Sequence, residues 1–339
     1  EAYLALGPHT HLGLYLALAT AATVFIISLA YNQVIELFPG GGGGYRVATT
    51  LIGPYAGLVS GAALIVDYVL TISISIASGA DALFSLLPLE FHWLKVVSEI
   101  ILIFLLLTLN LRGMKEAIKF LLPIFLGFVV VHVFLIIYGI NAHSGRIPLL
   151  IPETVNETVS LSRELGWTGV LAALMLAYSR GGGTYTGLEA VSNNVNTLAE
   201  PRVRTGKWTM FYMATSLALT AGGILLLYLL WGVAKEEGQT LNAITFKAII
   251  DNLQLGSPLL SQSALFVVLA LEAGLLFVAA NTGFLGGPAV MANMAADSWV
   301  PRQFRQLSSR LVTQNGMVLM GLAALAILLW SQGNVSLLV

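Results

Sequence analysis

The sequence contains no cysteine and few charged residues. Of its 339 residues only 10% are Asp, Glu, Lys or Arg, against about 25% in soluble domains. The absence of cysteine excludes disulfides, thiolate catalysis and cysteine-bound metals. The histidines are scattered, without the spacing of a metal site. A net charge of −1 and the lack of a basic cluster give no indication of nucleic-acid binding.

Apolar sequence, in contrast, is abundant. Hydrophobic residues make up 57% of the chain, and stretches of about 20 apolar residues, long enough to span a bilayer, recur along it. We therefore predict an all-α, multi-pass protein of the cell membrane, expected to be a prokaryotic plasma membrane, with the lipid bilayer as its main partner. The expected spans are Leu12–Leu37, Pro54–Leu87, Val96–Leu111, Ile118–Ile140, Trp167–Asn193, Trp208–Ala234, Leu259–Met294 and Val312–Trp330.

The distribution of positive charge predicts an orientation. Most Lys and Arg residues outside the spans follow the first, third, fifth and seventh spans, among them Arg46, Lys115 and Arg204. Because cytoplasmic loops are enriched in these residues, the first span should run from outside to inside. Residues 241–253 are too polar to span. We expect them to form a small amphipathic helix on the outer face, packed on protein rather than lying at the membrane interface.

The fifth predicted span is interrupted in its middle. Apolar residues 170–178 are followed by Ser179, Arg180, three glycines and the run Thr184-Tyr185-Thr186-Gly187. In lipid, unpaired backbone groups are costly, so a spanning helix unwinds only where the freed groups line a buried polar cavity. A broken helix is therefore a sequence indication of a transporter's substrate site.

Asp67 is the most informative single residue. It lies within the second span, where a carboxylate costs about 2.5–3.5 kcal/mol and usually faces the bundle interior. Helical spacing places it on one face with hydroxyl side chains, including Thr71. Carboxylates and hydroxyls are oxygen ligands for a hard cation, and we interpret Asp67 and Thr71 in this way. The serines on the same face fit an ordinary polar seam between helices.

The other intramembrane acids are Glu189 and Glu272. Glu189 follows the break, where a buried carboxyl group could carry a proton; the alternative is a salt bridge with Arg180. Glu272 has no local partner, and functional and structural roles are both open. Asn281 fits an inter-helix seam as well as a site, and His132 fits a structural role.

A run of five glycines, Gly40–Gly44, follows Pro39. The lysine and hydroxyl residue that would end a phosphate-binding loop are missing. We interpret the run as a flexible cytoplasmic connection.

The order of several motifs resembles that of a known family. The motifs are FPGGGGGY (Phe38–Tyr45), ALIVDYVLT (Ala63–Thr71), LNLRGMKE (Leu109–Glu116), TYTGLEAVSN (Thr184–Asn193) and Ala279–Phe304. In this order they resemble the amino acid–polyamine–organocation superfamily, and within it the KUP-type potassium transporters. The resemblance covers nearly the whole chain.

This resemblance implies a LeuT-like fold of two inverted repeats. Residues 1–140 would be the remainder of the first repeat, 141–166 an extracellular loop, and 167–339 the second repeat, so that the chain holds family helices two to nine. The chain begins without methionine and ends in a new apolar run. We expect a fragment that lacks the family's first broken helix and does not transport by itself.

The resemblance also implies site residues. Asp67, Tyr68 and Thr71 match the cation-binding motif of the third family helix. In the broken helix, Gly183, Thr184 and Thr186 supply substrate contacts, and Glu189 matches the buried acid that couples proton movement. Potassium would lie at Asp67, Thr71, Thr184 and Thr186. No cofactor is expected besides the transported potassium and protons, and a homodimer is a candidate assembly.

The expected function is therefore secondary active transport by alternating access, with proton-coupled potassium uptake as the leading hypothesis. The alternative is an amino acid permease of the same superfamily, including one for cationic amino acids, in which free helix ends bind a carboxylate. A channel would need symmetric repetition of a filter, which the chain lacks. We expect no enzyme, because no nucleophile–base pair or metal spacing is present. A sensor stays a further alternative.

Overall fold

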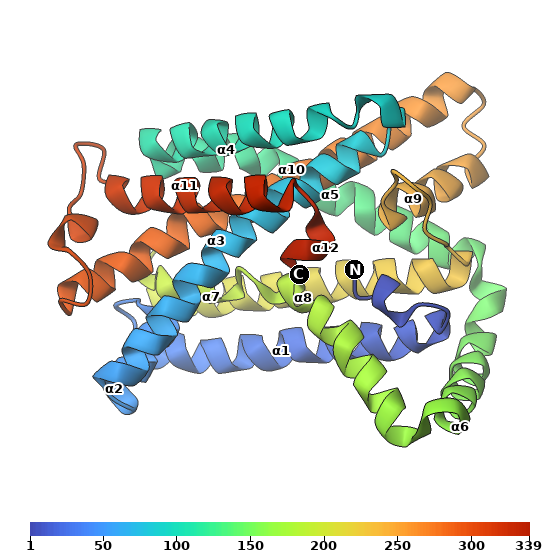
Figure 1. Ribbon diagram of the computed structural model, residues 1–339, viewed down its shortest axis with the longest axis horizontal. Helices are drawn as coiled ribbons and strands as arrows, with labels where there is room; N and C mark the ends of the chain where they lie inside the picture. The colour runs from blue at the N-terminus through green and yellow to red at the C-terminus, as the bar shows by residue number, and fades with distance from the viewer.

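The computed structural model describes the backbone of residues 1–339 and the side chains of residues 1–113, 119 and 121–339. This described chain forms helices and no strands (Figure 1). The α-helices are α1 (Gly13–Leu37), α2 (Gly43–Leu51), α3 (Pro54–Phe84), α4 (Leu94–Arg112), α5 (Met114–Ala142), α6 (Ile147–Arg180), α7 (Leu188–Asn193), α8 (Arg202–Trp231), α9 (Leu241–Asn252), α10 (Pro258–Ala296), α11 (Gln314–Ser331) and α12 (Val335–Leu338). Short 3-10 helices are η1 (Leu4–Leu6), η2 (Thr10–Leu12), η3 (Leu89–Phe91), η4 (Ser144–Arg146), η5 (Gly182–Tyr185), η6 (Val195–Thr197) and η7 (Arg302–Arg305).

Seven helices of the described part are long and apolar enough to cross a membrane: α1, α3, α4, α5, α8, α10 and α11. Each corresponds to a predicted span. The remaining predicted span, the fifth, over residues 167–193, is interrupted as the sequence predicted. Three sequence predictions involve side chains outside the described residues. They are the start of the fourth span at Ile118, the charge of Lys115 and the end of the motif Leu109–Glu116.

The surface is apolar where these helices face outward. On α1, Leu18, Ile26 and Leu29 are all more than 60% exposed, whereas Ser73 and Asn110 are completely buried on α3 and α4. Apolar residues outside and hydrogen-bonded polar residues inside are the arrangement expected when lipid surrounds the bundle. The fold is therefore that of an all-α membrane protein, as predicted.

Close approach between α3 and α10 forms the centre of the bundle. α3 crosses the molecule obliquely and packs most extensively against α10, while α1 runs beside α8 (Figure 1). Small residues allow this contact: a Cβ atom on Gly283 would lie 2.7 Å from the backbone oxygen of Tyr68. Tyr68 is thereby buried completely, beside the candidate site residue Asp67.

The segment 141–166, expected to be an extracellular loop, is mostly helical. α6 begins at Ile147 and is bent at Gly166, whose φ of 72° and ψ of 168° lie outside the helical range. A glycine tolerates this backbone conformation because it has no Cβ. The two arms of α6 form the V at the lower edge of Figure 1.

The amphipathic helix predicted over residues 241–253 is present as α9. It packs on protein, as expected, with Phe246, Ile249 and Ile250 in a cluster shared with α5, α8 and α10. The sequence spacing predicts a buried stripe of Leu241, Ile244, Ala248 and Leu255, but the buried face is rotated from it, because Ile244 and Ala248 are only partly buried.

Candidate ion and substrate site

The helix break lies between Arg180 and Leu188. α6 ends at Arg180, η5 forms one tight turn, and Thr186 is extended before α7 begins. Gly187 has a φ of 102°, which a residue with a Cβ rarely adopts. The run is open: a Cβ on Gly182 or Gly183 would have no neighbour within 4 Å.

Glu189 is buried directly after this break. Its Oε2 accepts a hydrogen bond of 2.9 Å from the Gly187 amide, one of the amides that a helix start leaves unpaired. Its Oε1 is buried and has no hydrogen-bond partner among the described residues. Arg180 is exposed. The structure thus pairs Glu189 with backbone, and the alternative of a Glu189–Arg180 salt bridge is wrong.

Asp67 lies half-buried on α3. The described residues offer its carboxylate no hydrogen bond or ion pair, whereas its backbone oxygen accepts a 2.8 Å bond from the Thr71 hydroxyl. Asp67 directly precedes Tyr68, whose hydroxyl accepts a hydrogen bond from Asn193 of α7, the helix that also carries Glu189. Two intramembrane acids therefore share one region of the interior, where they could hold a cation or a proton.

The predicted ligands fall into two groups. Asp67, Tyr68 and Thr71 lie on α3, and Gly183, Thr184 and Thr186 lie in the break. No described hydrogen bond joins the Thr184 or Thr186 side chain to the α3 group. The described link is a 2.6 Å bond from the Asn193 amide, at the end of α7, to the Tyr68 hydroxyl. Whether a potassium ion bridges the two groups stays a prediction.

The glycine run Gly40–Gly44 is not the flexible connection we expected. Gly41, Gly42 and Gly43 are buried and have positive φ angles. The Gly42 amide donates a 3.0 Å bond to the Asn193 backbone oxygen. The correction has a physical reason: without Cβ atoms the chain can approach the end of α7 more closely than any other residue type allows.

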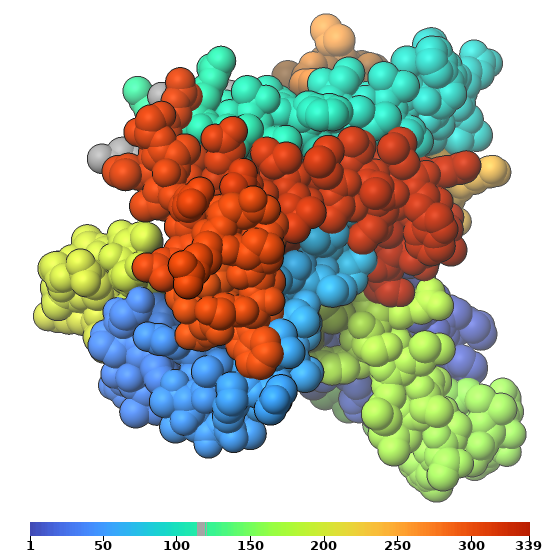
Figure 2. Space-filling view, turned by 60° about the vertical axis from the view of Figure 1, so that its left-hand side comes forward, coloured from blue at the N-terminus to red at the C-terminus, as the bar shows by residue number. Residues whose placement is uncertain are grey.

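The buried tyrosine after this run adds a second anchor. The hydroxyl of Tyr45 donates a 2.6 Å bond to Asp297 at the end of α10. Burial, followed by the bond and charge of Asp297, raises the pKa of Tyr45 to about 12. Figure 2 shows the α2 region, in blue, lying against the chain that follows α10, in orange.

The sequence predicted no role for Asn193. Asn193 belongs to the motif Thr184–Asn193, but a polar residue at the end of a helical segment is most simply explained as a helix end. The signal that could have identified it is the glycine run, since consecutive buried glycines require a close neighbour, although the sequence alone does not say which.

Glu272, Asn281 and His132, which the sequence analysis also considered, have structural partners. Glu272 accepts a hydrogen bond from Asn242 of α9, which in turn accepts one from Tyr228. Asn281 accepts a 2.6 Å bond from Asn110 and so forms the expected inter-helix seam. His132 bonds the Phe128 backbone oxygen at 3.0 Å and stacks on the Phe128 ring, as expected of a structural residue.

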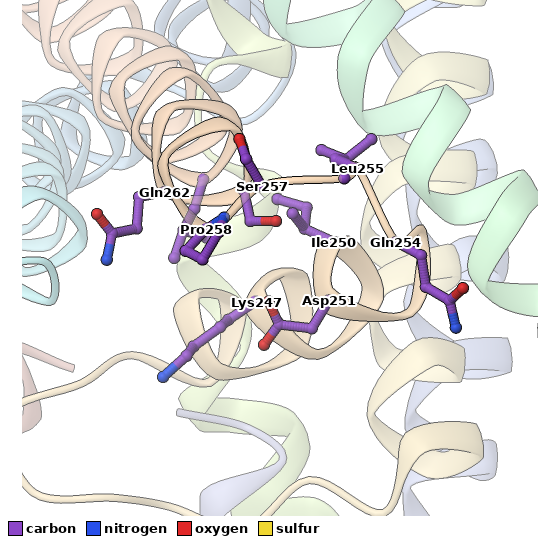
Figure 3. A pocket seen from close by; sticks show the side chains of 11 residues that line it. Lys247, Ile250, Asp251, Gln254, Leu255, Ser257, Pro258 and Gln262 are labelled. Carbon is purple, nitrogen blue, oxygen red and sulfur yellow. The ribbon is translucent and has the colours of Figure 1, made fainter.

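Two cavities lie away from Asp67 and Glu189. One of about 600 Å³ lies between the end of α9 and the start of α10, with Lys247 and Asp251 on the α9 side and Gln262 on the α10 side (Figure 3). The other, of about 360 Å³, is an apolar groove between α1 and α6 that ends at Thr23 and Tyr178. Neither is lined by Asp67 or Glu189.

A bundle of membrane helices with a broken segment and two acids within it is the architecture of a membrane transporter. In agreement, the family described as "Amino acid permease" matches residues 4–339. The chain is also similar to "Potassium transporter KimA" of Bacillus subtilis (strain 168), with 31% identity over 322 residues, which cover 94% of this chain and 50% of KimA. The chain thus spans about half the length of the curated relative that it matches.

The chain therefore belongs to the amino acid permease family. The predicted resemblance to the amino acid–polyamine–organocation superfamily and to potassium transporters within it is confirmed. The family and the relative are transporters and not enzymes, as the sequence indicated, and the chain is a multi-pass protein of the cell membrane.

Proposed function

We propose that this protein takes up potassium together with protons by alternating access. The observation that carries the proposal is the half-buried Asp67 carboxylate, which has no hydrogen bond or ion pair among the described residues, on a helix that Tyr68 and Asn193 join to the helix of Glu189. A carboxylate within a membrane span is costly unless a positive charge joins it. Potassium at Asp67 and a proton on Glu189 would each supply such a charge.

Potassium would be held by oxygen atoms from both groups of predicted ligands. Asp67 and Thr71 would contribute from α3, and Thr184 and Thr186 from the break, with the Gly183 carbonyl beside them. The extended backbone at Thr186 and the single turn of η5 leave carbonyl groups outside a regular helical ladder. Such carbonyl oxygens are suitable ligands for a dehydrated potassium ion. The similarity to a protein named as a potassium transporter supports this choice.

An amino acid substrate is the second candidate, favoured by the family's description. The same break could bind a carboxylate through free amides, and Asp67 could bind an ammonium group. The two candidates differ in what they carry, so a transport assay separates them.

The test is uptake of radioactive rubidium, a potassium mimic, into proteoliposomes that contain the protein made from its complete gene. An inward proton gradient should drive rubidium accumulation, and unlabelled amino acids should leave it unchanged. Accumulation of a labelled amino acid without rubidium flux would replace potassium by an amino acid as the substrate. Light scattering of the purified protein would test the predicted homodimer.

A further inference from the structure

The glycine run encloses the end of α7. A Cβ atom on Gly41 would lie 2.7 Å from the Asn193 backbone oxygen, and one on Gly43 would overlap the Asn193 Oδ1 and lie 2.9 Å from the Ser192 hydroxyl. The Gly42 amide donates to Asn193 between these two contacts. Three consecutive residues thus contact one asparagine, and at Gly41 and Gly43 a Cβ would overlap it.

The same asparagine reaches the candidate ion site. Asn193 is 4% exposed, and its Nδ2 donates a 2.6 Å bond to the hydroxyl of Tyr68, which is completely buried. Tyr68 follows Asp67 on α3, and Asn193 lies on the same short helix as Glu189. The position of the Tyr68 phenol therefore depends on where Asn193 lies.

The glycine run is itself anchored. α2 begins directly after Gly42, and Tyr45 on its first turn packs against Gly61 of α3 and donates to Asp297. The run cannot shift as a loose loop would, because the following helix is tied to α3 and α10. Because Gly41, Gly42 and Gly43 contact Asn193, the position of the run determines where Asn193 lies.

We propose that the glycine run, acting through Asn193, is a positioning element that sets the Tyr68 hydroxyl in the ion site. This inference rests on the proposed site, not on the identity of the transported substrate. A Cβ on Gly43 would displace Asn193 and move the phenol, so substrate affinity should fall although no residue that contacts the substrate has changed. Misplacement of binding groups by about 1 Å is enough for large functional losses.

The test uses Gly43→Ala in the protein from the complete gene. Two variants serve as matched controls. Gly40→Ala lies in the same run but adds a Cβ with no neighbour within 4 Å, and Gly7→Ala imposes a comparable positive φ, 57° against 43°, also in open space. We expect the rubidium concentration for half-maximal uptake to rise about tenfold in Gly43→Ala, with the maximal rate nearly unchanged. Both controls should resemble the wild type.

A double-mutant cycle separates positioning from general damage. Asn193→Ala should raise the half-maximal concentration by a similar factor, and Gly43→Ala combined with Asn193→Ala should be no worse than Asn193→Ala alone, because the added methyl then has no asparagine side chain to displace. Two effects that multiply to about a hundredfold loss, or a Gly43→Ala protein with wild-type affinity, would overturn the inference.

A substrate-independent measurement keeps the outcome separate from the proposed function. Amide hydrogen exchange of residues 188–193 should be at least several-fold faster in Gly43→Ala than in Gly40→Ala. If rubidium is not carried, the proposed potassium function fails, while this comparison and the same cycle with the transported amino acid still test the positioning role. Equal amide exchange of residues 188–193 in Gly43→Ala and Gly40→Ala would contradict the positioning role. If Gly43→Ala does not fold, Gly41→Ala replaces it in both measurements.

Discussion

Two glycine-rich segments of this protein have similar composition and opposite surroundings. In Gly40–Gly44, three glycines are buried against Asn193, and added Cβ atoms would overlap protein atoms. In 181–187, Gly182 and Gly183 have open space around them. Glycine allows close packing in the first segment, whereas in the second it interrupts the helix directly before Glu189. Glycine content alone therefore does not distinguish a structural contact from a substrate-lining break.

The largest effect should come from the acid that we propose binds potassium together with the open segment. Asp67→Asn keeps the size of the side chain but removes the charge that we propose binds potassium. We expect rubidium uptake to be abolished, with expression and melting temperature like those of the wild type. The assay is rubidium uptake into proteoliposomes, with Ser78→Ala on the same helix as a control that should transport. Normal uptake by Asp67→Asn would show that the cation assignment is wrong.

A second substitution tests the proton at the break. Glu189→Gln retains an oxygen that can accept from the Gly187 amide, so the start of α7 should stay intact, but the side chain can no longer gain or lose a proton. We expect rubidium exchange to persist and its dependence on the proton gradient to be lost. The measurement compares uptake with and without an imposed gradient, and undiminished gradient-driven accumulation would remove Glu189 from the coupling role.

A third comparison sets the two glycine segments against each other in stability. Gly41→Ala forces a side chain into a φ of 83° and against the Asn193 backbone, which should cost about 1–3 kcal/mol. Gly182→Ala meets no neighbour and no positive φ, so its effect should stay within about 1 kcal/mol and could be stabilising. Thermal unfolding in detergent would measure both. Equal losses would mean that the two segments do not differ in the way described.

The smallest effect concerns the anchor after the first glycine run. Tyr45→Phe removes the bond to Asp297 and leaves the packed ring, which should cost about 1 kcal/mol of stability. The raised pKa of Tyr45 determines how the stability contributed by its hydroxyl depends on pH. The neutral hydroxyl is stabilised in the folded protein, so its contribution is complete below pH 10, the ordinary tyrosine value, and is lost as the pH rises through about 12. Melting curves of both proteins at neutral pH should therefore keep a constant difference.

Much of the fold was predictable because lipid imposes a strong constraint. Long apolar runs fixed the spans, and the interruption after Tyr178 identified the broken segment, since few other arrangements tolerate glycines in a membrane helix. The helix from Ile147 was not predicted because its sequence is partly polar. The packing of α9 was predicted, but not which face is buried, because that depends on neighbours distant in sequence.

The candidate site was predictable only residue by residue. Asp67 and Glu189 are conspicuous because carboxylates are rare in apolar spans, and the structure joins their helices through Tyr68 and Asn193. The link between their helices is not visible in the sequence, because Tyr68 and Asn193 are 125 residues apart. The glycine run was misinterpreted for the same reason: its neighbour, Asn193, comes from a distant segment.

The most direct test of the account is to locate the ion itself. A structure of the protein from its complete gene, determined with rubidium in place of potassium, should show anomalous scattering from one rubidium ion between the Asp67 carboxylate and the backbone and hydroxyl oxygens of Thr184–Thr186. A rubidium ion bound elsewhere, with Asp67 and the open glycine segment unoccupied, would contradict the account.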